Sequence, residues 1–283
     1  MRKNGYSLYG AVGLLSILLI ACLLAPWIAP YDPFSGQVNA RFLPVSLAHL
    51  LGTDHFGRDI FSRLLYGGRV TLPASFIALS IATGLGTGMG LWAAVTSRWW
   101  VRQLLLKSAD LLIAWPFLVI AMATIGFFGP GLDKLLGLVI VTHWAPVSRL
   151  VYSLAKEALA FEYVIASKVA GARTLRIVWQ DLLPHCLSFI FVQFTFDLSN
   201  VILTLASLSF FGLGAQPPTP EWGSMLSDGR VYLSQYPLLL IAPVAAITLV
   251  VLCLNLIGEY YRLQQEPLFV PARWEVMPLW SHS

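Results

Sequence analysis

The chain contains 283 residues, of which 57% are hydrophobic and 11% are charged, and its formal net charge is +4. Ordinary globular domains carry about 25% charged residues, so this composition indicates a protein of the lipid bilayer and excludes an ordinary soluble domain. No run of basic residues indicates nucleic-acid binding. The three cysteines share no common spacing, so they predict neither a disulfide framework nor a metal site.

Six apolar stretches are long enough to cross a hydrocarbon core of about 30 Å as helices. They predict an all-α, polytopic membrane protein whose six transmembrane helices form one bundle. Lys and Arg accumulate on the side of the chain termini, which predicts a cytoplasmic N-terminus and C-terminus. In chain order, the predicted spans are 8–29, 70–95, 104–128, 132–151, 185–211 and 237–257.

The first span follows Arg2 and Lys3 and contains Leu-Ile-Ala-Cys ending at Cys22, a pattern that also fits a lipoprotein signal. Apolar residues continue to Ile28, however, and a signal peptide has a shorter apolar region. We therefore predict a membrane anchor at this place.

Charged residues gather just before the second span. Asp54, Arg58, Asp59 and Arg63 alternate in sign, so on a short helix they would form a lattice of ion pairs. A catalytic carboxylate pair is the alternative, but no nucleophile or metal-ligand cluster accompanies it. Inside the second span, four glycines between positions 84 and 90 predict close helix packing. No Gly-Lys-Ser/Thr follows them, so we predict no ATP site in this chain.

Polar residues also occur within the later spans. Ionisable groups at such positions usually face the bundle interior or a water-filled path, and Pro116 and Pro146 should bend the third and fourth spans. Side chains that only hold helices together are the alternative, and Asp110 could simply pair with Lys107. The candidate residues of a translocation path are Asp110, His143, Trp144, Asp197 and Asn200.

The segment at about 160–177, between the fourth and fifth spans, mixes apolar residues at near-helical spacing with charged ones. It predicts a short helix that lies along the inner face of the membrane. An ordinary interfacial helix would show the same periodicity, so the residue types must decide. Small residues would allow close approach to a partner surface, and the flanking charges could pair across it.

These residue types resemble the EAA motif of ABC importer permeases. In that family the motif forms a coupling helix that docks on the ATP-hydrolysing subunit. Ser167 stands where a second alanine is usual, and His185 follows the proline where Asn is common. The residues that carry the resemblance, and that it assigns to ATPase coupling, are Glu162, Ala166, Ser167, Gly171, Ile177, Leu183 and Pro184.

Two further segments resemble signature segments of the dipeptide, oligopeptide and nickel permease branch, in its second, C-type subunit. They are LGTDHFGRDIFSRLLYGGRVTL at 51–72 and LSFFGLGAQPPTPEWGSMLSDGR at 208–230. In the second segment we expect Gly212 and Gly214 to end a helix and Trp222 to anchor at the membrane interface. The prolines would make either a lid near the docked binding protein or a rigid connector.

The resemblance implies a type I ABC importer permease in the inner membrane, without catalytic, cofactor or metal sites of its own. The expected partners are a homologous second permease, two ATP-binding subunits that hold ATP and magnesium, an extracytoplasmic binding protein and membrane lipid. The expected organisation is an N-terminal tail, first helix and outer loop at 1–69, a permease domain at 70–267, and a tail at 268–283. The sequence YYRLQQEP before that tail departs from the branch pattern.

The cargo stays open between peptides, nickel and metal-chelate complexes. A His-Trp pair at 143–144 resembles some nickel-type members, which favours a chelated metal slightly, although one histidine is too few to hold a bare ion. An ion-coupled secondary transporter is the alternative function, but the halves of the chain show no paired broken helices. An intramembrane enzyme would need a nucleophile or metal motif, and neither His-Glu-x-x-His nor Gly-x-Ser-x-Gly occurs.

Overall fold

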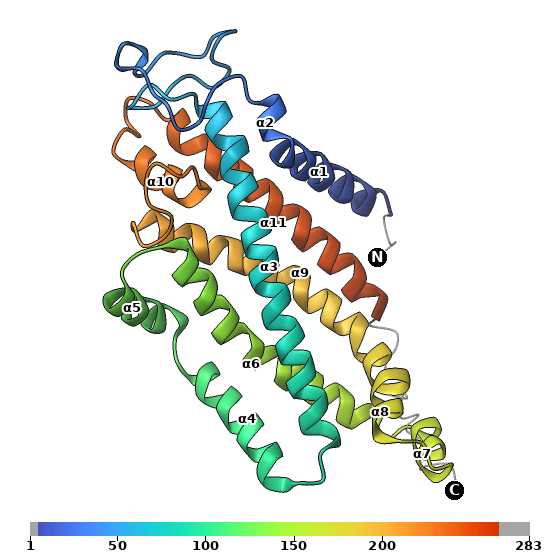
Figure 1. Cartoon of the computed structure of the whole chain (residues 1–283). Helices are drawn as coiled ribbons and strands as arrows, with labels where there is room; N and C mark the ends of the chain where they lie inside the picture. The colour runs from blue at the N-terminus through green and yellow to red at the C-terminus, as the bar shows by residue number, and fades with distance from the viewer. Residues whose placement is uncertain (1–4, 266–283) are drawn as a thin grey trace, which may run out of the picture.

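The computed structural model describes residues 5–265, which fold into a bundle of helices without a β-strand among them (Figure 1). The predicted tail at 268–283, like Arg2 and Lys3, lies outside the described residues. A 3₁₀ turn, Val38–Ala40, lies in the first long loop. The helices are α1 (Gly5–Leu23), α2 (Ala25–Ile28), α3 (Ile60–Val95), α4 (Trp99–Ala114), α5 (Phe117–Phe128), α6 (Leu132–Ala158), α7 (Glu162–Val169), α8 (Thr174–Ile177), α9 (Leu183–Phe210), α10 (Trp222–Arg230) and α11 (Leu238–Gln265).

The predicted set of spans is confirmed, with one of them broken. Five helices are long and apolar enough to cross a membrane, and α4 and α5 give a sixth span when the pair, which is bent by 87°, is counted as one. The break lies at Trp115 and Pro116. Trp115 has an extended backbone, as expected for a residue that precedes proline. Pro116 lacks the N–H that a continuous helix would need.

The second span begins ten residues before the predicted position 70, because α3 starts at Ile60. Hydropathy missed this part since it carries charged residues. Asp59 caps the helix by accepting a hydrogen bond from the Ser62 backbone N–H at 2.8 Å, and Arg63 is buried within ion pairs. The charged groups of Asp59 and Arg63 are therefore paired within the protein.

Helix α3 lies at the centre of the bundle and packs along α6 (Figure 1). A side chain at Gly86 would meet the Trp144 carbonyl oxygen at 2.5 Å, and one at Gly90 would meet the Ser148 carbonyl oxygen at 2.6 Å. Gly84 and Gly88 have nothing within 4 Å. Of the four glycines, Gly86 and Gly90 thus make the predicted close helix contact, and Gly84 and Gly88 do not.

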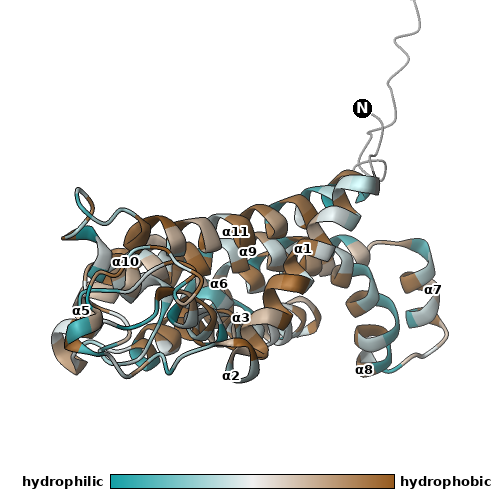
Figure 2. Ribbon diagram, turned by 90° about the horizontal axis from the view of Figure 1, so that it is seen from above, coloured by the Kyte–Doolittle hydropathy of each residue, from teal (hydrophilic) through white to brown (hydrophobic). Residues whose placement is uncertain are grey.

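Two sets of elements lie at opposite ends of the bundle. The loop at 29–59 and α10 form one end, and α7 and α8 project from the other (Figure 1). Seen from above, α7 and α8 stand at one edge and carry hydrophilic as well as hydrophobic residues, whereas hydrophobic residues cover most of α9 and α11 (Figure 2).

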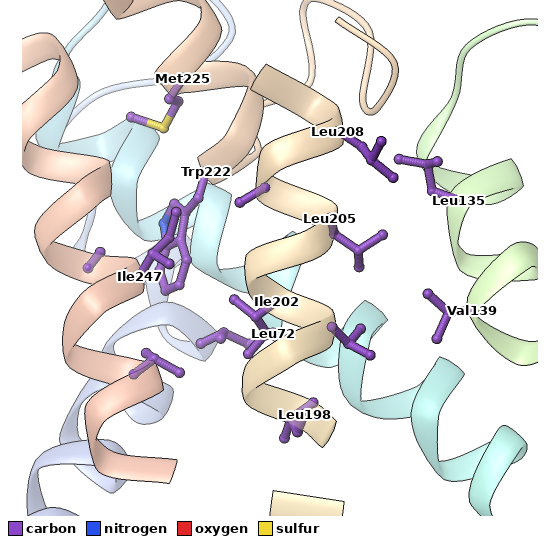
Figure 3. Packing of buried hydrophobic residues seen from close by; sticks show 14 of the residues in the cluster. Leu72, Leu135, Val139, Leu198, Ile202, Leu205, Leu208, Trp222, Met225 and Ile247 are labelled. Atoms are coloured by element: carbon purple, nitrogen blue, oxygen red, sulfur yellow. The ribbon is translucent and has the colours of Figure 1, made fainter. Parts of the chain in front are cut away.

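The main core joins α3, α9, α10 and α11, and it includes Trp222 of α10. Figure 3 shows the indole of Trp222 between α11 and α9, close to Ile202 and Ile247. Trp222 is 1% exposed, and its Nε1–H donates to the Leu64 carbonyl at 2.9 Å. The expectation that Trp222 anchors at the membrane interface was wrong. Gly67 and Gly68 leave room for its ring against α3.

Candidate functional site

The candidate coupling segment consists of α7, α8 and the single π-helical turn Val178–Leu182 that leads into α9. The sequence predicted one helix at about 160–177, but the structure divides it into two short helices. Gly171 causes the division, because it has φ +82°, a left-handed conformation that glycine adopts without strain. The Gly171 N–H donates to the Lys168 carbonyl at 3.0 Å, which closes the end of α7.

Buried apolar side chains fix this segment to the bundle. Val164, Ile177 and Leu182 pack with Leu154 and Ala158 of α6 in a second core cluster. Val164 and Leu182 are fully buried, so α7 and α8 are tied to the C-terminal end of α6 and the N-terminal end of α9. A displacement of α7 and α8 would therefore act directly on two membrane-spanning helices.

The predicted coupling residues divide into two groups by exposure. Glu162, Ala166, Gly171 and Pro184 are exposed and Ser167 is half-buried, whereas Ile177 is buried and Leu183 is half-buried. The last two hold the segment in place and do not face outward. Large apolar and aromatic side chains that the motif does not include add to the exposed surface of the segment, and they are Tyr163, Ile165, Val169, Leu175 and Trp179.

The predicted path residues lie on α4, α6 and α9, and the hydrogen-bond partners of His143 and Asp197 are local. His143 Nδ1 lies 3.2 Å from the Val139 carbonyl oxygen of its own helix. Asp197 accepts a hydrogen bond from Gln193 at 2.8 Å. Trp144 is half-buried and Asn200 is exposed. These contacts fit side chains that satisfy their own helices.

Asp110 pairs with Arg149 of α6, whose Nε lies 3.0 Å from its Oδ1. The prediction that Asp110 pairs with Lys107 was wrong, because α4 packs against α6 and brings Arg149 to the Asp110 carboxylate. Both side chains are about half exposed, so the ion pair stabilises the contact between α4 and α6 only modestly.

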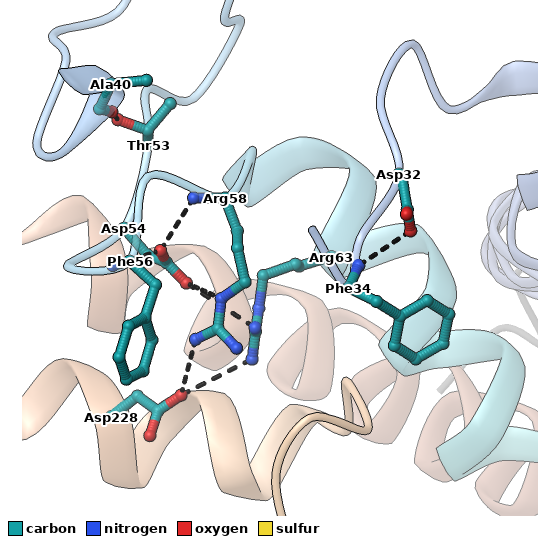
Figure 4. Close-up of polar contacts among 9 residues, drawn as sticks. All are labelled: Asp32, Phe34, Ala40, Thr53, Asp54, Phe56, Arg58, Arg63 and Asp228. Atoms are coloured by element: carbon teal, nitrogen blue, oxygen red, sulfur yellow. Dashed lines mark hydrogen bonds and ion pairs between the residues drawn. The ribbon is translucent and has the colours of Figure 1, made fainter. Parts of the chain in front are cut away.

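A buried ionic cluster stands at the opposite end of the bundle, where Asp54, Arg58, Arg63 and Asp228 meet (Figure 4). Arg58 Nε donates to Asp54 Oδ2 at 2.7 Å, and Arg63 Nη1 lies 3.6 Å from the same oxygen. Asp228 of α10 lies 3.5 Å from both arginines. The predicted lattice exists, but Asp54 and Arg58 lie in a turn that precedes α3, and Asp59 pairs with His49 instead, at 2.9 Å.

Sequence reasoning missed Asp228 and Glu221, which join α10 to this end of α3. Asp228 lies 165 positions from Arg63, so no local spacing could indicate the contact. Glu221 is fully buried and accepts hydrogen bonds from the N–H groups of Gly223 and Ser224 at 2.8 Å. Its position just before a helix was the one available signal for a cap. Burial raises the pKa of the Glu221 carboxyl above its ordinary value.

The connection from α9 to α10 agrees with the expected helix stop. Helix α9 ends at Phe210, and Gly212 follows with φ +81°, which is the conformation of a helix C-cap glycine. The Leu213 N–H donates to the Leu208 carbonyl at 3.0 Å. The chain then turns back so that α10 packs against α9 and α11.

Comparison with known protein families agrees with this architecture. The model for binding-protein-dependent transport system inner membrane components matches residues 86–267. The chain belongs to this family. It is the permease subunit of an ABC importer and a multi-pass protein of the inner membrane, and members of the family are not enzymes. The model for the N-terminal transmembrane domain of oligopeptide transport permease C matches residues 1–44.

Curated relatives of this permease include dipeptide transport proteins. It is 36% identical over 267 residues to the dipeptide transport system permease protein DppC of Alkalihalophilus pseudofirmus, covering 94% of this chain and 87% of the relative. It is also 36% identical to DppC of Haemophilus influenzae, covering 94% and 92%. The di/tripeptide transport system permease protein DppC of Pseudomonas aeruginosa is 36% identical, with 91% and 88% covered.

Solved structures share the fold of the permease. A chain of the MetNI methionine ABC transporter, in an inward-facing conformation, has a TM-score of 0.59 at 18% identity and covers 72% of this chain and 97% of its own. A chain of an amino acid ABC transporter with histidines has a TM-score of 0.56 at 14% identity, with 72% and 94% covered. An importer permease of this kind works in general with a partner permease, ATP-binding subunits and a substrate-binding protein.

Proposed function

We propose that this permease supplies half of the membrane pathway of a dipeptide or oligopeptide importer. The observation that carries the proposal is the match at 36% identity over nearly the whole chain to permeases named for dipeptide and di/tripeptide transport. The other half would come from a homologous second permease. ATP and magnesium would be bound by two partner ATPases, and cargo would arrive on an extracytoplasmic binding protein.

The named relatives favour peptide over the metal chelate that the sequence context of His143 suggested, and the surroundings of His143 give it a packing role. Its Nδ1 is already engaged by the Val139 carbonyl oxygen and by Thr142 Oγ1 at 3.1 Å. The ring also packs edge-on against Phe117 of α5, with the centroids 5.9 Å apart. A ring held this way helps to place α5 against α6.

The coupling function is assigned to the outward surface of α7 and α8. Its apolar side chains include Val169, 84% exposed, and Leu175, 69% exposed, and exposed apolar groups of this size mark interaction surfaces. Arg173 and Arg176 on the same segment are exposed as well and could pair with acidic groups of an ATPase. Movement received there would reach α6 and α9 through the buried Val164 and Ile177.

The proposed orientation places both termini and α7–α8 in the cytoplasm, and the loop at 29–59 with α10 outside. Cysteine labels at Ser227 and Thr174, in a background without the native cysteines, test it directly. An impermeant thiol reagent added to intact cells should react at position 227 and not at position 174. Labelling of position 174 alone would contradict the proposed orientation and support the opposite one.

Uptake by the assembled transporter tests the cargo. Membrane vesicles that contain the two permeases, the ATPases and the binding protein should accumulate labelled dipeptide when ATP is supplied, and the His143→Ala variant should accumulate it equally well. Nickel, cobalt and zinc should stay at background in both. The opposite result would be ATP-dependent accumulation of metal that His143→Ala abolishes, with no uptake of dipeptide. That result would contradict a peptide cargo and support a metal-chelate cargo.

A further inference from the structure

An apolar slot opens between α1, α3, α9 and α11, and it has a volume of about 520 Å³. Its inner wall is formed by buried side chains such as Cys22, Ile202 and Val250, which are at most 5% exposed. Leu23 and Phe76 stand at its rim, and each is 52% exposed. Leu72, Leu198 and Ile202, which line the slot, appear below Trp222 in Figure 3. The slot thus leads from the exposed surface of the bundle into the core.

One charged residue, Arg69 of α3, lines this slot. Arg69 is exposed, and within residues 5–265 no carboxylate forms an ion pair with it. An arginine within a membrane-spanning helix is costly unless it finds a counter-ion or reaches the interface. Thr195, the hydroxyl residue of the lining, is already bonded to the Val192 carbonyl at 2.8 Å. The slot therefore combines a long apolar wall with one free cation.

The depth of Arg69 matches the boundary between head groups and acyl chains. Arg69 lies nine residues after Ile60, the start of α3, which is about 14 Å along the helix at 1.5 Å per residue. Leu23, at the end of α1, lines the slot beside it, and Trp27 in the following helix is 80% exposed. Exposed tryptophans are typical of the membrane interface. A charged group at Arg69 could thus stay at the interface while its apolar part extends inward.

We infer that the slot binds a membrane phospholipid, with its phosphodiester against the Arg69 guanidinium and one acyl chain between α1, α3 and α9. Guanidinium and phosphate match in charge and in hydrogen-bond geometry. The apolar lining extends from Arg69 to Phe76 on α3 and from Leu23 to Leu15 on α1, roughly 10–12 Å of helix on each side. A transmembrane helix of the second permease is a poorer fit. It is about 10 Å wide, and α1 already packs against α3 and α11 at this place.

The bound lipid would fix α1 to the rest of the bundle. Helix α1 packs against α11 and α3, and much of its length is exposed, as for Ile17 at 66% and Tyr9 at 75%. A chain that fills the slot gives the inner side of α1 the contacts that it lacks against α9. The occupant belongs to the leaflet on the side of α10 and the 29–59 loop.

Native mass spectrometry of the assembled importer, released from membranes in mild detergent, tests this site. Wild-type complexes should retain one phospholipid for each copy of this chain. Arg69→Gln should lower that retention by roughly fivefold or more, as expected for the loss of one charge-assisted contact. Leu19→Trp should do the same by filling the slot, since Leu19 lines it. The matched controls Arg98→Gln and Ile17→Trp alter exposed residues elsewhere and should retain the lipid.

Cross-linking identifies the occupant independently. The complex is reconstituted in vesicles of phosphatidylethanolamine and phosphatidylglycerol that contain a phosphatidylglycerol with a photoreactive acyl chain. Adducts should concentrate on slot residues of α1, α3 and α9 and disappear in Leu19→Trp. Equal lipid retention in all five proteins would overturn the inference. So would adducts spread evenly over the exposed helix faces.

Discussion

Replacement of Asp54 by Asn removes one charge from the ionic cluster and keeps the shape of the side chain. The Asp54 side chain is 5% exposed, and its Oδ2 lies 2.7 Å from Arg58 Nε and 3.6 Å from Arg63 Nη1. The variant leaves two buried arginines that face only the half-exposed Asp228. Removing one partner of a buried ion pair typically costs about 3–5 kcal/mol, and we expect that loss of unfolding free energy.

The matched variant is Asp228→Asn in the same cluster. The Asp228 side chain is 31% exposed, and each of its contacts to the arginines is 3.5 Å long. A partly solvated pair at this distance contributes about 1 kcal/mol or less. Asp54→Asn should therefore destabilise the protein several times more than Asp228→Asn does.

Thermal unfolding of the purified protein in detergent measures both variants. For a chain of this size, 1 kcal/mol corresponds to roughly 2–4 °C in Tm. The Tm of Asp54→Asn should fall by on the order of 10 °C, and that of Asp228→Asn by about 4 °C or less. Equal shifts in the two variants, or an unchanged Tm for Asp54→Asn, would refute the view that burial of the pair decides its energy.

Two further changes separate packing from charge. Gly86→Ala should lower Tm, because its Cβ would lie 2.5 Å from the Trp144 carbonyl oxygen and overpacking costs about 1–3 kcal/mol. The control Gly84→Ala, with nothing within 4 Å of its Cβ, should leave Tm unchanged or raise it. A larger fall in Tm for Gly84→Ala than for Gly86→Ala would contradict the α3–α6 contact. The pKa of Glu221 is raised in the folded protein by burial, so the stability that it contributes is complete below its ordinary pKa of 4.5 and decreases as pH rises through the folded pKa. Glu221→Gln should flatten the dependence of Tm on pH above 4.5, and an unchanged slope would show that another group titrates.

Hydropathy and short motifs predict much of this fold, because each span and each helix stop is a local property. The spans, the break at Pro116 and the stop at Gly212 follow from apolar length and from backbone chemistry of single residues. The start of α3 was missed because it carries charged residues. Arg63 is buried there in ion pairs with Asp54 and Asp228, and Asp228 is distant in the sequence. The length of an apolar run cannot predict that a charged residue beside it is buried in an ion pair.

The candidate coupling segment was predictable as a place but not in its shape. The residue types around Gly171 identify the segment, yet the same motif contains both exposed residues and the buried Ile177. The burial of a side chain in this segment depends on where α6 and α9 end. The periodicity of eight residues in α7 does not predict where those helices end. Trp222 shows the same limit, since its burial depends on Gly67 and Gly68 some 155 positions earlier.

The most direct test of the account is ATP-driven dipeptide uptake by the reconstituted transporter with two variants at Gly171. Asn and Asp have the same shape, and both tolerate the left-handed backbone better than other side chains do. Gly171→Asp also adds a charge to a surface proposed to be covered by the ATPase. Gly171→Asn should keep most of the uptake, while Gly171→Asp should lower it by roughly tenfold or more, as for an unpaired charge buried at an interface, with the protein still present in the membrane. Equal uptake by the wild type and both variants would contradict the assignment of α7 and α8 as the coupling segment.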